Sequence, residues 1–82
     1  MAAEDTRLTA PAIASLLAHL LTGAAGGNEV RWKKLIGEVE VLPIAFHAKG
    51  NWRVMPTGTA KERAAIANAV AVVAAEHPYA RS

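Results

Sequence analysis

Apolar residues recur at a helical period in the first third of the chain. They follow the i, i+3, i+4, i+7, i+8 spacing of one buried stripe, namely Ile13, Leu16, Leu17, Leu20 and Leu21. Thr9 precedes the stripe as an N-cap residue, and Pro11 lies in the first turn, where its missing N–H costs nothing. The pattern predicts a helix from Ala10 to Thr22 that ends at Gly23.

Residues 28–37 fit two different patterns. A helix would begin at Asn28 as its N-cap and stop at Gly37. It would place three apolar residues on one face, namely Trp32, Leu35 and Ile36. A strand would alternate inward from Val30, but Lys34 interrupts that alternation. The helix accounts for both ends of the segment and is preferred, with the strand left open as the alternative.

Branched and aromatic residues dominate Val39–Phe46, which suits a pleated strand. Pro43 cannot donate a ladder hydrogen bond, so this is an edge strand or two short pieces. His47–Asn51 contains a glycine and an asparagine, both of which favour turns. Trp52–Met55 then forms the return strand, and the whole segment predicts a β-hairpin.

The chain from residue 57 to 78 marks both ends of a long helix. Thr59 stands three residues before Glu62, the spacing at which each side chain accepts a hydrogen bond from the other residue's backbone N–H. Pro78 disfavours helical geometry at His77 and ends the run. The predicted fold is therefore an α+β domain in the order helix, short helix, β-hairpin, long helix.

Composition places all 82 residues in a single compact domain, with residues 1–8 expected to be a disordered N-terminal segment. Hydrophobic residues make up 52% of the chain, but many of them are alanines, which bury little area. The last helix has an alanine-rich second side that permits close approach of another helix: Ala64, Ala71 and Ala75. A homodimer would supply the burial that so small a core lacks.

No membrane or secretory feature is visible in the sequence. The start, Met1–Arg7, is net acidic, unlike a signal peptide. The apolar stretch Ala10–Leu21 is too short to span a bilayer. The absence of cysteine excludes disulfides and thiolate metal sites. A soluble, cytoplasmic protein without a membrane partner is expected.

Conventional catalytic and ligand-binding patterns are missing as well. The histidines His19, His47 and His77 are too far apart in sequence for an H-x-x-x-H metal pair. At the end of the last helix, His77 is expected to cap or pack. Gly23–Gly27 lacks the spacing of a phosphate-binding loop, and Ser15 does not lie on a strand-to-helix elbow. The sequence therefore predicts a non-enzymatic protein without metal or cofactor.

Basic and aromatic residues lie together in the middle of the chain, which holds most of the net charge of +2. Cations flank both indoles, Trp32 and Trp52, a combination that can bind phosphates and stack on bases. With so few aromatic residues in the chain, the two tryptophans are more simply core anchors covered by basic side-chain stems. The candidate partner-binding residues are Arg31, Lys33, Lys34, His47, Lys49, Asn51 and Arg53.

These residues predict a small binding module that contacts another protein. Its small size and lack of a catalytic site suit a regulator or inhibitor, of the kind that a phage or mobile element encodes. The alternative is a DNA- or RNA-binding regulator that uses the same basic and aromatic segment.

Overall fold

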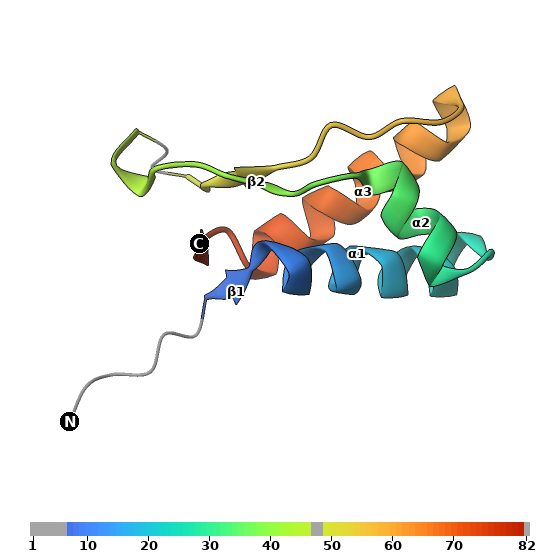
Figure 1. Cartoon of the computed structure of the whole chain (residues 1–82), viewed down its shortest axis with the longest axis horizontal. Coiled ribbons are helices and arrows are strands. Elements are labelled where there is room, and N and C mark those ends of the chain that lie inside the picture. Colours follow the sequence, from blue (N-terminus) through green and yellow to red (C-terminus); the bar gives the residue numbers. More distant parts are fainter. Residues whose placement is uncertain (1–6, 47–48, 82) are drawn as a thin grey trace.

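Helices form the body of the fold, and very short strands form two pairs beside them (Figure 1). Within residues 7–46 and 49–81, which the computed structural model describes, there are three α-helices, one 3-10 helix and four two-residue strands. This mixed content confirms the predicted α+β class and the single compact domain. The elements in chain order are β1 (Leu8–Thr9), α1 (Ala10–Ala25), α2 (Glu29–Ile36), β2 (Glu40–Val41), η1 (Ile44–Phe46), β3 (Trp52–Arg53), α3 (Ala60–Glu76) and β4 (Ala80–Arg81).

Helix α1 begins where the sequence indicates and continues beyond the predicted end. The Thr9 hydroxyl accepts a hydrogen bond from the Ala12 N–H at 3.3 Å. The expected stop at Gly23 is wrong, because nothing there forbids helical geometry and the two alanines that follow favour it. The helix ends at Gly26, which takes a φ of 83° that other residues rarely adopt. Its buried side is Ile13, Leu17, Ala18 and Leu21.

Residues 29–36 form the helix α2, and the strand alternative is wrong. The Asn28 side chain accepts a hydrogen bond from the Arg31 N–H at 2.8 Å, which caps the helix as predicted. Gly37 ends it. The buried residues Trp32 and Ile36 lie on the side that packs against α1 and the rest of the core.

The predicted hairpin is present but much shorter than expected. Strands β2 and β3 pair antiparallel, with Glu40 opposite Arg53 and Val41 opposite Trp52. Pairing does not continue as a strand to Phe46, because Pro43 has no N–H and the chain then turns into the 3-10 helix η1. The first part of the predicted turn, residues 47–48, lies outside the described residues.

The capping box of α3 is confirmed. The Glu62 N–H donates to the Thr59 hydroxyl at 3.1 Å, and the Thr59 N–H donates to Glu62 Oε1 at 2.9 Å. Gly58 precedes the cap with a φ of 107°, and a Cβ there would lie 2.9 Å from Glu62 Oε1. Only glycine therefore suits the approach to this helix. At the other end His77 is the C-cap, as its position predicts.

A parallel strand pair, β1 with β4, was not predicted. Leu8 pairs with Ala80 and Thr9 with Arg81. Leu8 therefore belongs to the folded domain rather than to a disordered segment, whereas residues 1–6 of that predicted segment lie outside the described part. The fully buried large apolar side chains come from all three α-helices and form the centre of the core: Ile13, Leu17, Ile36 and Ile66.

Candidate functional site

The predicted partner-binding residues do not form one surface. Arg31, Lys33 and Lys34 lie on α2, whereas Lys49 and Arg53 belong to the hairpin. Figure 1 shows α2 and the hairpin turn at opposite ends of the molecule. His47 lies outside the described residues. The basic residues next to Trp32 and those next to Trp52 therefore lie in two separate regions of the structure.

Asn51 has a structural role inside the domain. Its side chain is buried, with 2% of the residue exposed. The amide nitrogen donates to the carbonyl oxygens of Leu42 at 3.0 Å and Ala80 at 2.8 Å. The amide oxygen accepts from the Ala80 N–H at 2.6 Å. Because these bonds join the hairpin to β4, Asn51 has no group left to offer a partner.

Arg53 is exposed but paired within its own hairpin. Its guanidinium donates to both carboxylate oxygens of Glu40, at 3.1 and 3.3 Å, across the β2–β3 pair. Lys49 is exposed in the turn, and we find no ion-pair partner for it within residues 7–46 and 49–81. Among its described residues, the hairpin thus offers one unpaired cation instead of a basic cluster.

Both tryptophans are buried, as predicted for core anchors. Trp32 is 7% and Trp52 9% exposed. The Trp32 ring N–H donates to the Gly26 carbonyl at 2.7 Å, and the Trp52 ring N–H donates to the His77 carbonyl at the same distance. Neither indole presents a face on which a nucleic-acid base could stack.

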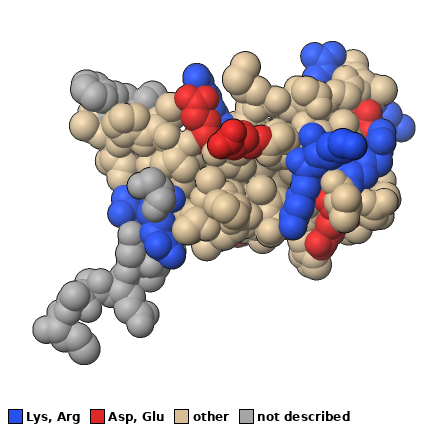
Figure 2. Space-filling model, in the orientation of Figure 1, with Lys and Arg blue, Asp and Glu red and all other residues tan. Residues whose placement is uncertain are grey.

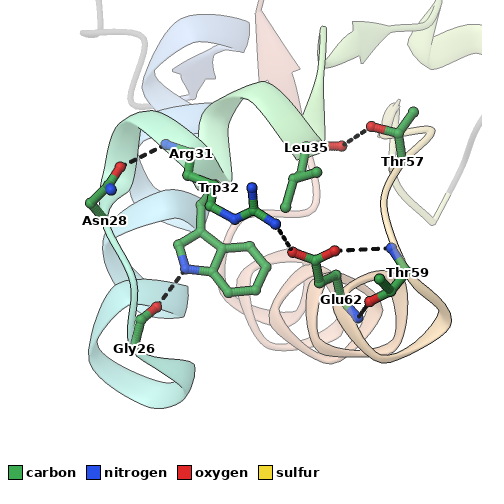
Figure 3. A network of polar contacts seen from close by, with 8 residues as sticks. All are labelled: Gly26, Asn28, Arg31, Trp32, Leu35, Thr57, Thr59 and Glu62. Carbon is green, nitrogen blue, oxygen red and sulfur yellow. Dashed lines mark hydrogen bonds and ion pairs between the residues drawn. The ribbon is translucent and has the colours of Figure 1, made fainter.

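Arg31 joins α2 to the start of α3 (Figure 3). Its guanidinium donates to Glu62 Oε2 at 2.6 Å, while Glu62 Oε1 holds the Thr59 N–H. Two hydrogen bonds hold the pKa of Glu62 below its ordinary value. The bond from the Thr59 backbone has the larger effect, and the bond from Arg31 has the next largest. Nearby, the Thr57 N–H donates to the Leu35 carbonyl at 2.8 Å. Arg31 therefore positions one helix against another and is only partly available to a partner.

The remaining predicted cations lie on one exposed side of α2. Val30, Lys33 and Lys34 are spaced i, i+3 and i+4, so they share a face of the helix, which we call the α2 face. Val30 is 78% exposed, and both lysines are exposed. Neither lysine has an ion-pair partner in the part of the chain that the structure describes. Figure 2 shows basic side chains gathered at this end of the molecule.

The described residues contain no group of three or more His, Cys, Asp or Glu side chains that could hold a metal ion. The imidazole Nδ1 of His19 lies 3.0 Å from Glu29 Oε1, an exposed contact that links α1 with α2. An open groove of about 670 Å³ lies beside β2, and its polar side chains are Glu38, Glu40 and Arg53. It contains no serine, threonine or histidine that could act as a nucleophile or base.

No helix in the described ranges combines the length and the apolar character needed to cross a membrane. Comparison of the chain with protein-family models, with curated proteins and with solved structures finds no match.

Proposed function

We propose that this protein is a small non-enzymatic binding module whose α2 face contacts an acidic surface of another protein. The observation that carries the proposal is the α2 face itself, where the exposed Val30 lies beside Lys33 and Lys34. A valine that is largely exposed, next to two lysines without an ion pair to any described residue, suits a partner with an apolar patch bordered by carboxylates. Such a module would act as a regulator or inhibitor of the protein that it binds.

Burial of the indoles favours a protein partner over nucleic acid. A module for single strands needs aromatic faces for stacking, and both tryptophans are inside the core. Reading of bases in a duplex needs side chains along a helix that reach base edges. The exposed side of α2 instead carries Val30 and two lysines, which can contact phosphates or a guanine edge but would distinguish few sequences. DNA or RNA therefore remains the second outcome of the test below.

The test is affinity capture with matched variants of the full chain as baits. Lys33→Glu/Lys34→Glu reverses the charge of the α2 face, and the control Lys49→Glu/Arg63→Glu changes the net charge by the same amount at exposed positions outside it. We expect an acidic protein to be retained by the wild type and the control and to be lost from the α2-face variant. Quantitative mass spectrometry of the captured fractions measures this.

The kinetics of the captured pair then test the mechanism. Charge reversal at the α2 face should slow association, and the difference from the wild type should shrink as salt is added, because steering between charged surfaces is screened. Equal capture by both variants would exclude the α2 face. Retention of nucleic acid by the wild type, seen as a high ratio of absorbance at 260 to 280 nm and lost in the α2-face variant, would establish the nucleic-acid function instead.

A further inference from the structure

A second open hollow, which no residue of α2 lines, lies between the second half of α1 and α3. It measures about 310 Å³. Its walls are mainly aliphatic, with Leu20 and Ala24 from α1 and Ala65 and Val72 from α3. Val72 is 51% exposed although it is a large apolar residue. The groove is therefore an apolar face that the described part of this chain does not cover.

One seam of α3, exposed except at the half-buried Ala65, runs along this groove. Its residues are separated by four, three, four and four positions, the spacing of side chains that meet a second helix: Lys61, Ala65, Asn68, Val72 and Glu76. A cation stands at one end and an anion at the other, with Ala65, Asn68 and Val72 between them. Lys61 and Glu76 are exposed, and neither has an ion-pair partner within residues 7–46 and 49–81.

We propose that a second copy of this chain covers the groove, with the two α3 helices antiparallel about a two-fold axis near Asn68. In that register Lys61 lies opposite Glu76 of the partner subunit, and Ala65 lies opposite Val72 of the partner subunit. Opposite charges meet at both ends, and a small residue faces a large one on each side of the axis. The seam is thus complementary to itself, as an interface between identical subunits across a two-fold axis must be.

A parallel pairing of the same seams would be unfavourable. It would place Lys61 beside Lys61 of the partner subunit, and Glu76 beside Glu76 of the partner subunit, so that like charges repel. The two α3 helices can also approach each other closely, because the exposed side of α3 carries small residues: Ala64, Ala71 and Ala75. The small core of a domain of this size would gain the additional apolar burial.

The test measures the mass of the full chain by sedimentation over about a hundredfold range of concentration, since dimer formation follows mass action. We expect the wild type to form a dimer. Each single variant, Lys61→Glu or Glu76→Lys, should raise the dimer dissociation constant by roughly tenfold, because two symmetry-related pairs become repulsive. The double variant Lys61→Glu/Glu76→Lys should restore dimerisation, since both charges are reversed and opposite charges again meet at each end.

Two further variants separate this inference from folding and from the proposed function. Val72→Ser should weaken the dimer while the monomer keeps its far-UV circular dichroism, because Val72 is half exposed. Lys33→Glu/Lys34→Glu, on the α2 face, should leave dimerisation unchanged. The inference is overturned by a monomer at every concentration, which would also be the result if the groove binds a helix of another protein. A dimer that the double variant does not restore would overturn the antiparallel register.

Discussion

Asn51 is the only polar residue buried in the described part of the core, and its whole side-chain amide is occupied. It bonds to Leu42 next to the hairpin and to both backbone groups of Ala80 in β4. Its own backbone N–H donates to the Pro78 carbonyl at 3.0 Å. The side chain and the backbone of Asn51 therefore join the hairpin to the C-terminal segment by hydrogen bonds.

Asn51→Ala should lower the free energy of unfolding by about 3 kcal/mol, because it removes the side-chain bonds to the half-buried Leu42 carbonyl and to the buried backbone groups of Ala80. Urea unfolding of the full chain measures the change. Lys49→Ala, in the exposed turn nearby, should change stability by less than about 0.5 kcal/mol. Equal midpoints for the Asn51 variant and the wild type would contradict the structural role.

Glu62 makes a pH-dependent contribution to stability. Its pKa in the folded protein is below the ordinary value of 4.5, so it binds fewer protons folded than unfolded in the acid range. Its stabilising effect is complete above about pH 4.5 and is lost as the pH falls through the lowered pKa. Glu62→Gln should therefore be less stable than the wild type at neutral pH, and the gap should narrow in acid. Parallel stability curves from pH 7 to about pH 2 would refute this.

At the level of elements, the ends of α2 and α3 are defined by local side chains. Asn28 caps α2, and the reciprocal Thr59–Glu62 pair caps α3. Arg31 then uses the same Glu62 carboxylate to hold the two helices together. Glu62 therefore stabilises the α3 start in two ways, through the cap and through the contact with Arg31.

Thr59→Ala should cost about 1 kcal/mol of unfolding free energy, the usual effect of losing an N-cap hydroxyl. Thr59→Gly is the matched variant and should cost only a few tenths of a kcal/mol, because glycine is tolerated at this position. Chemical denaturation of both proteins checks the difference. A Thr59→Ala protein as stable as the wild type would mean that the hydroxyl bond to the Glu62 N–H contributes nothing.

The elements that could be predicted from the sequence are those whose determinants are close together in the chain. The caps at Asn28 and Thr59 act over three residues, and the apolar spacing of α1 is visible in the sequence itself. The pairing of β1 with β4 and the burial of Asn51 depend on residues far apart in sequence, and two-residue strands carry no alternation. Likewise, Trp32 and Trp52 are each flanked by basic residues in the sequence, but the two groups of basic residues lie in separate regions of the fold.

For the molecule as a whole, the two buried indoles report on different regions of one core. Trp32 is on α2 and Trp52 on β3, and both contribute to the same apolar cluster. We expect native fluorescence at short wavelength and a shift to the red on unfolding. The fluorescence transition and the loss of helical circular dichroism should coincide, because a domain with one core unfolds as a unit. Separate midpoints would indicate that the hairpin and the helices unfold independently.

The pairing of β1 with β4 has a consequence for the order of events in folding. The Arg81 guanidinium donates to the Arg7 carbonyl at 3.0 Å across 74 positions of sequence. Closing so long a loop costs entropy before any contact forms, so this strand pair should be among the last native structure to appear. Weakening it should accelerate unfolding and leave the folding rate nearly unchanged. During synthesis, α1 and α2 can pack as soon as they are made, but the domain can close only after residue 81 has been added.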